Sequence, residues 1–204
     1  MQTEPDPVQL VVGFVEGKVP PAAFAECLYE NQALETFLSD PSLEWGSTYI
    51  VTNPYYYCLE LDYGTTRGVL NAKGALQLFL DRKGIAATPD KATEQRHDLL
   101  TKVQPGWLDV DLDWLERTVL PEAGDRTGKN LETWLKGRLR ELFRCRKRPP
   151  RWIQNPDWPI GENGPLYFLG QIAIDDCELF HDEAAAFVFL DPTTGATATI
   201  IQVA

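Results

Sequence analysis

The sequence predicts an α+β fold, with a mainly helical N-terminal two-thirds and a small antiparallel β-sheet in the C-terminal part. Before about residue 145, apolar residues recur at the spacing of an amphipathic helix in several segments. After Pro149 and Pro150 that spacing stops, and three segments rich in β-branched and aromatic residues follow, separated by turn-forming residues. We therefore divide the chain into a helical region, residues 1–146, and a Trp/Pro-rich junction with a β-rich C-terminal region, residues 147–204.

Several segments of the first region are predicted to be helices. In residues 67–84, apolar side chains gather on one face and Gly84 can form the C-cap. Asp111 can cap a short helix over residues 110–120. The sequence leaves open whether residues 8–14 are a strand or a first helical turn, and whether residues 47–63 are a strand or a helix. The other predicted helices cover residues 19–40, a segment from Asp90 to Val103, and a segment that begins at Thr127.

Three strands are predicted in the second region, over residues 166–174, 184–191 and 197–204. Residues 161–164 (GENG) and 191–195 (DPTTG) have the composition of turns. Short strands joined by such turns are typical of antiparallel hairpins.

Composition indicates a globular protein. A chain of 204 residues with 44% hydrophobic and 24% charged residues can bury a sizeable core. No apolar run has the length of a membrane span, and residues 1–9 lack the pattern of a secretory signal, so we expect a cytoplasmic protein that does not bind membranes. Four widely separated cysteines and two histidines favour free thiols over a disulfide framework or a metal site, and no cofactor is expected.

Charge is distributed unevenly along the chain, whose formal net charge is −11. Residues 136–151 carry eight basic side chains and one acidic one, whereas residues 152–204 carry eight acidic side chains and no basic one. Helix-dipole complementarity and a contact with the acidic C-terminal part can explain the basic block. The alternative is a nucleic-acid-binding adaptor that uses residues Arg138 to Arg151.

Motifs for catalysis or metal binding are weak. The string GDRTGKN (124–130) has the wrong glycine spacing for a phosphate loop and lacks its Ser/Thr, and DVDLD (109–113) lacks the glycine of a calcium loop. The acidic residues around His181 could support a metal-dependent enzyme, but one histidine is little support for it. A charged surface loop that docks a basic partner explains them as well, and we expect no enzymatic activity.

The junction and the first strand carry a motif, P-P-x-W-I-Q-x-P-x-W-P-I-x-x-x-G-x-P-L-x-F-x-G-Q, which resembles a group of bacterial immunity proteins. These proteins protect against polymorphic toxins. Segments around GVLNAKGALQLFLDRKGI, VQPGWLDV and AGDRTGK also resemble that group, so the resemblance covers most of the chain. The motif residues are Pro149, Pro150, Trp152, Ile153, Gln154, Pro156, Trp158, Pro159, Gly164, Pro165, Phe168, Gly170 and Gln171.

The resemblance implies an antitoxin that binds a secreted effector, often a nuclease delivered by a contact-dependent or type VI secretion system. Because nucleases are basic where they hold phosphates, an acidic inhibitor can compete for that surface. We expect no direct nucleic-acid binding, and a homodimer is left open. The expected contact residues form two acidic clusters: Asp109, Asp111, Asp113 and Glu116, and Asp175, Asp176, Glu178 and Asp182.

Overall fold

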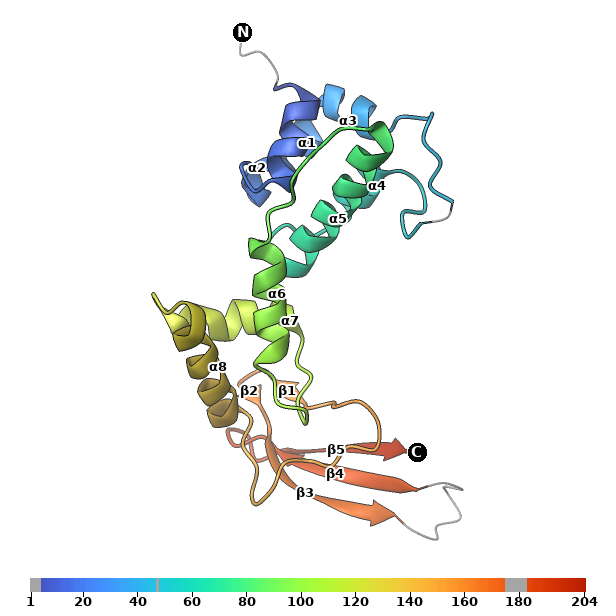
Figure 1. Ribbon diagram of the computed structural model, residues 1–204. Coiled ribbons are helices and arrows are strands. Elements are labelled where there is room, and N and C mark those ends of the chain that lie inside the picture. The colour runs from blue at the N-terminus through green and yellow to red at the C-terminus, as the bar shows by residue number, and fades with distance from the viewer. Residues whose placement is uncertain (1–4, 47, 175–182) are drawn as a thin grey trace. The chain divides into compact units, whose positions relative to one another are not determined.

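The chain forms two compact units, residues 1–98 and residues 99–204 (Figure 1). The computed structural model describes residues 5–46, 48–174 and 183–204. Helices precede antiparallel sheets along the chain, which confirms the predicted α+β class. In those three ranges, no helix has both the length and the apolar character needed to cross a membrane. The predicted boundary between residues 146 and 147 marks a change of composition, whereas the compact units divide within helix α6.

The first unit is helical. Its helices are α1 (Pro7–Val15), α2 (Pro21–Glu30), α3 (Gln32–Leu38), α4 (Pro54–Leu59) and α5 (Thr66–Lys83), and α6 (Ala92–Lys102) spans the division between the units.

Residues 8–14, which the sequence left open, belong to a helix whose N-cap is Asp6. The prediction of one helix over residues 19–40 is wrong, because the helix is interrupted at Asn31. The Asn31 backbone is extended, and its side-chain oxygen accepts a hydrogen bond from the Leu34 amide at 2.9 Å. An Asx side chain that caps a new helix competes with continuation of the old one, so α2 and α3 are separate.

The open segment 47–63 contains a helix rather than a strand. Asn53 caps α4 through a 3.0 Å bond from the Tyr56 amide, and Pro54 occupies its first turn. Tyr55 is buried and donates its hydroxyl hydrogen to the Leu28 carbonyl oxygen at 2.9 Å. Tertiary packing thus overrides the strand propensity of the tyrosines.

Helix α5 lies in the core of the first unit, and Gly84 ends it in the predicted left-handed conformation (φ 69°). The buried side chain Lys73 projects from α5. Its Nζ lies 3.2 Å from Asp90 Oδ2 and 3.3 Å from Thr93 Oγ1, and 5.8 Å from the centre of the Phe14 ring. This contact holds the chain after α5 against the helices. The largest fully buried side chains of this core are Phe14, Phe24, Phe79, Leu28, Leu34, Leu38, Ile50, Leu76 and Leu80.

After α6, the second unit continues with irregular helical turns. Asp111 caps α7 (Leu112–Trp114) as predicted, since its side chain accepts a 2.7 Å bond from the Asp113 amide. A π-helical turn (Leu115–Val119) and a 3₁₀ turn (Leu120–Ala123) replace the remainder of the predicted helix. Helix α8 (Gly128–Leu142) follows.

The three predicted strands form one antiparallel sheet of order β3-β4-β5. Its strands are β3 (Tyr167–Ile174), β4 (Ala184–Leu190) and β5 (Thr197–Val203). A bulge interrupts the register of β3 between Phe168 and Gly170. In the 191–195 turn, Asp191 accepts bonds from two backbone amides, and residues 160–165 form a further small hairpin of β1 (Ile160–Gly161) and β2 (Gly164–Pro165).

One face of this sheet packs against α8 and the junction, as Figure 1 shows. Trp158 lies at the centre of this core: its ring is 5.5 Å from Trp107, 5.6 Å from Phe143, 6.0 Å from Phe168 and 5.4 Å from Phe189. Its Nε1 donates to the Leu166 carbonyl at 2.8 Å. The second unit therefore has an aromatic core that shares no residue with that of the first.

Candidate functional site

The acidic segment, Asp109–Glu116, lies on the surface of the second unit over a buried backbone. Leu108, Val110 and Leu115 are buried, so the intervening carboxylates face outward or lie at the edge of the core. Asp109 and Asp111 are exposed, whereas Asp113 and Glu116 are half-buried. The structure therefore brings the first predicted cluster together on one short stretch of chain.

Two hydrogen bonds fix the backbone of the acidic segment. Gln104 uses both ends of its amide on Val110: Nε2 donates to the carbonyl at 3.0 Å, and Oε1 accepts from the amide at 2.7 Å. Because Val110 is also buried, Asp109 and Asp111 are carried on a fixed backbone. Such fixed charges lose less conformational entropy on binding than charges on a free loop.

The second predicted cluster lies outside the described residues. Asp175, Asp176, Glu178 and Asp182 belong to it, together with His181. Its neighbour Glu183 is exposed, and its carbonyl accepts a 2.8 Å bond from the Ala204 amide.

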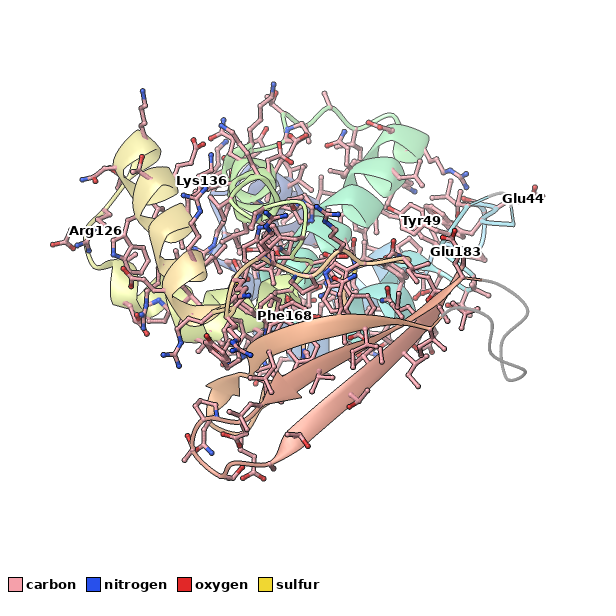
Figure 2. The ribbon with its side chains drawn as sticks, turned by 90° about the horizontal axis from the view of Figure 1, so that it is seen from below. Glu44, Tyr49, Arg126, Lys136, Phe168 and Glu183 are labelled. Carbon is pink, nitrogen blue, oxygen red and sulfur yellow. The ribbon has the colours of Figure 1, made fainter. Side chains whose placement is uncertain are left out.

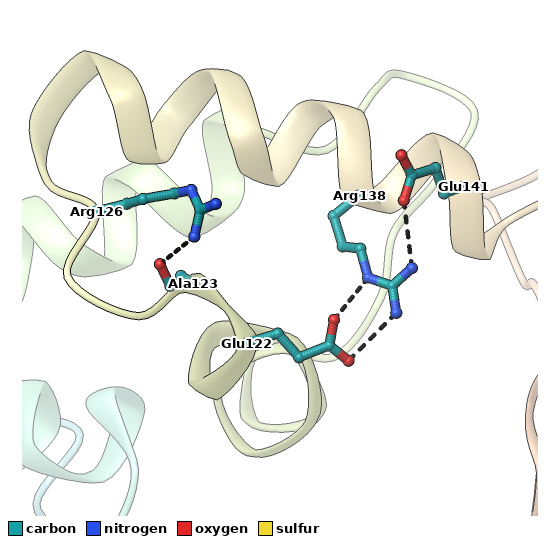
Figure 3. A network of polar contacts seen from close by, with 5 residues as sticks. All are labelled: Glu122, Ala123, Arg126, Arg138 and Glu141. Carbon is teal, nitrogen blue, oxygen red and sulfur yellow. Dashed lines mark hydrogen bonds and ion pairs between the residues drawn. The ribbon is translucent and has the colours of Figure 1, made fainter.

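The basic block of residues 136–151 divides into two groups. In the first group, Lys136, which is labelled in Figure 2, pairs with Glu132 at 2.6 Å. Arg138 pairs with Glu122 at 2.7 Å and with Glu141 at 3.3 Å (Figure 3). Hydrogen bonds from these bases lower the pKa of Glu122 and of Glu132. The pairs of Lys136 with Glu132 and of Arg138 with Glu141 lie within α8, and the pair of Arg138 with Glu122 joins α8 to the preceding 3₁₀ turn.

The second group, which we call the basic strip, extends from the C-terminal end of α8 into residues 146–151. Its members have no ion pair with any carboxylate in residues 5–46, 48–174 or 183–204, so the predicted contact with the acidic C-terminal part is not found there. Arg144 instead lies over the Tyr167 ring, 5.9 Å from its centre. The basic strip consists of Arg140, Arg144, Arg146, Lys147, Arg148 and Arg151.

The basic strip surrounds two adjoining hollows that share Pro149. The larger, about 600 Å³, lies between residues 146–151 and residues 168–171 of β3. The smaller, about 340 Å³, is lined by Trp107, Phe143 and the C-terminal end of α8. No acidic side chain from the described part of the chain lines either hollow.

Hydrogen bonds fix residues 151–155 of the junction to the rest of the second unit. Trp152 donates its Nε1 hydrogen to the Trp107 carbonyl at 2.9 Å, and Gln171 accepts from the Arg151 amide at 2.7 Å. The buried side chain of Gln202 accepts from the amides of residues 153 and 154, both at 3.0 Å, and donates to the Asn155 carbonyl at 2.9 Å. Sequence reasoning missed Gln202; a polar residue at an inward position of a predicted strand was the available signal.

Two kinds of catalytic site, a metal-ligand cluster and an activated thiol, can be assessed within the part of the chain that the structure describes. No three His, Cys, Asp or Glu side chains there could hold a metal ion together. Burial raises the pKa of the Cys58 thiol to about 12, which suppresses the thiolate that a nucleophile requires. His97 is half-buried on α6, with Nδ1 3.8 Å from Asp98 Oδ1.

Comparisons with protein-family models, with curated proteins and with solved structures find no match for this chain. The resemblance to immunity proteins therefore stays a prediction from the sequence motif.

Proposed function

We propose that this protein is an immunity protein, which binds a cognate secreted toxin with a nuclease domain and neutralises it in the cytoplasm. The observation that carries the proposal is the acidic segment, in which Asp109 and Asp111 are exposed on a backbone that Gln104 and the core hold fixed. The sequence motif of the junction supports the same function. Inhibition by binding requires no catalytic group on this chain.

Charge complementarity is the physical basis of the inhibition. A nuclease presents basic side chains where it holds phosphates, and carboxylates at fixed positions can occupy that surface. Attraction between the acidic chain, with its net charge of −11, and a basic toxin raises the association rate. The acidic segment supplies the local contact, and the net charge supplies the long-range attraction.

The test is protection of cells that express the toxin encoded next to this protein's gene. The double variant Asp109→Lys/Glu116→Lys should lose protection, with toxin affinity lowered by about 2 kcal/mol or more if the segment is a hot spot. Asp157→Lys/Glu162→Lys is the matched control, because it makes the same charge change at exposed positions of the same unit. Equal affinity and equal salt dependence for the wild type and both variants would refute the acidic segment as the contact surface.

Measurements on the purified protein distinguish the immunity function from two alternatives, a metal-dependent enzyme and a nucleic-acid adaptor. Stoichiometric metal in the purified protein, lost in His181→Ala, would favour the metal-dependent enzyme. Retention on DNA or RNA at low salt, lost when Arg146 and Arg148 are replaced, would favour the nucleic-acid adaptor.

A further inference from the structure

The loop of residues 146–151 is fixed to β3 at both ends. At its start, the Arg146 amide donates to the Phe168 carbonyl at 3.0 Å, and the Phe168 amide donates to the Arg144 carbonyl at 2.9 Å. At its end, Gln171 Oε1 accepts from the Arg151 amide at 2.7 Å. The four basic side chains of the loop are therefore carried on an ordered backbone around the larger hollow.

The basic strip has no ion pairs with described carboxylates, whereas the other two bases of the block, Lys136 and Arg138, do have them. Lys136 and Arg138 take up the carboxylates of Glu122, Glu132 and Glu141. The six members of the strip cluster around hollows with no acidic lining from the described residues. Like charges held close together repel one another, so an anionic ligand would relieve a cost already present in the free protein.

The walls of the hollows indicate which anion fits. Phe168 is 3% exposed and Phe143 is 2% exposed, so neither can serve as a stacking platform for bases. Trp107, which is half-buried, already packs against Trp158, with ring centres 5.5 Å apart. Arg144 already lies over the Tyr167 ring. Apolar walls are supplied by half-buried Pro149 and Leu169, which suit aliphatic side chains between carboxylates.

The surroundings of the strip also disfavour a long nucleic acid. Trp114 lies against Phe143, with ring centres 5.8 Å apart, and so places the acidic segment beside the end of α8 that carries Arg140 and Arg144. A uniformly charged phosphate backbone that ran from the strip onto the acidic segment would be repelled by the carboxylates of that segment. A protein can match a surface of alternating sign, whereas a nucleic acid cannot.

We infer that the basic strip is a docking surface for an acidic segment of a protein partner, in which carboxylates alternate with apolar side chains. Five of its six cations are arginines, whose planar guanidinium groups bind carboxylates in a bidentate manner. The inference does not depend on the partner being a toxin, and it assigns this surface a separate role from that of the acidic segment.

Fluorescence anisotropy on the full chain tests the inference, with a short labelled peptide in which glutamate alternates with leucine as the probe. The peptide should bind at low salt, and Arg146→Glu/Arg148→Glu should weaken binding at least about tenfold. The matched control, Lys91→Glu/Lys129→Glu, makes the same charge change at exposed residues that do not belong to the strip, and its affinity should stay within about twofold of the wild type. Far-UV circular dichroism checks that both variants are folded, and Arg146→Gln/Arg148→Gln removes charge without adding acids.

Three results would overturn the inference. The first is equal weakening by both charge-reversal variants, because that indicates only net charge. The second is binding of a peptide with glutamine in place of glutamate as tight as that of the acidic peptide. The third is tighter binding of single-stranded oligothymidylate than of the acidic peptide, which would assign the strip to nucleic acid.

Discussion

The ion pair between Lys73 and Asp90 is unusual for its burial. The Lys73 side chain is only 10% exposed, whereas that of Asp90 is 32% exposed. A buried ammonium group without its partner costs more than the pair itself contributes. Replacing the two residues should therefore cost unequal amounts of stability. Removing Asp90 leaves a buried charge on Lys73, whereas removing Lys73 leaves a carboxylate that water can reach.

We predict that Asp90→Asn destabilises the first unit by about 2 kcal/mol, and that Lys73→Met costs less, because methionine fills the same space without a charge. Urea unfolding followed by far-UV circular dichroism measures both. A larger loss in Lys73→Met than in Asp90→Asn would contradict the prediction.

The same pair gives a pH dependence. Hydrogen bonds from the Ala92 amide and from Lys73 lower the pKa of Asp90 below its ordinary value of 3.8. The contribution of Asp90 to stability is thus complete above that value and is lost as the pH falls through the lower, folded-state pKa. The stability difference between the wild type and Asp90→Asn should therefore shrink on acidification.

At the scale of an element, α5 begins in a turn that leaves no room for a side chain at Gly68. Thr65 caps the helix by accepting from the Gly68 amide at 3.0 Å, and it donates its hydroxyl hydrogen to the Asp62 carbonyl at 3.0 Å. A Cβ at Gly68 would lie 2.0 Å from that same carbonyl oxygen. At Gly74, in the same helix, the nearest atom would be Tyr49 Oη at 3.4 Å.

We predict opposite effects for alanine at these two glycines. Gly68→Ala should destabilise the first unit by about 2–3 kcal/mol, because the turn must move. Gly74→Ala should be neutral or stabilise it by up to about 1 kcal/mol, because alanine is the better helix former. Chemical unfolding midpoints of the two variants test this, and equal destabilisation by both would refute the steric argument.

Local signals account for the elements that the sequence predicted correctly. The three sheet strands have β-branched or aromatic residues bounded by turns, and Gly84 follows a long apolar face. The interruption at Asn31 was not predicted, because the sequence does not show whether an asparagine caps a new helix or lies in the middle of a continuous one. Segment 47–63 could not be decided, since burial of Tyr55 against Leu28 depends on contacts distant in the chain.

The candidate site was predictable only where it is local. The acidic segment is one short stretch, so its four residues are close in any fold. The division of the basic block was not predictable, because Arg138 meets Glu122, sixteen residues earlier in the chain, only after α8 has folded back. Gln202 forms hydrogen bonds with residues 153–155, which lie almost fifty residues earlier in the sequence, and no local sequence pattern predicts such a contact.

At the scale of the whole molecule, the two cores are separate and the tryptophans divide between them unequally. Trp45 belongs to the first core, whereas the other five tryptophans all lie in residues 99–204. The fluorescence of a Trp45→Phe variant therefore reports on the second unit alone. Circular dichroism at helical wavelengths reports on both units.

We predict that Gly68→Ala, introduced into Trp45→Phe, adds an early phase to urea unfolding measured by circular dichroism. The fluorescence midpoint should stay where it is in Trp45→Phe alone, because each unit has its own core. A fluorescence midpoint that moves together with the circular dichroism signal would mean that the units unfold as one.

The contacts of Gln202 have a consequence for synthesis on the ribosome. The core of the first unit and its Lys73–Asp90 pair involve only residues up to about 90. The junction of the second unit lacks four of its hydrogen bonds until β5 has been translated: three with Gln202, and one from Gln154 to the Val203 carbonyl. Trp152 and Trp158 lack part of their aromatic packing until β4 has been translated. The nascent chain should therefore fold in two steps, and a ribosome stalled before Thr197 would carry a folded first unit and an incomplete second one.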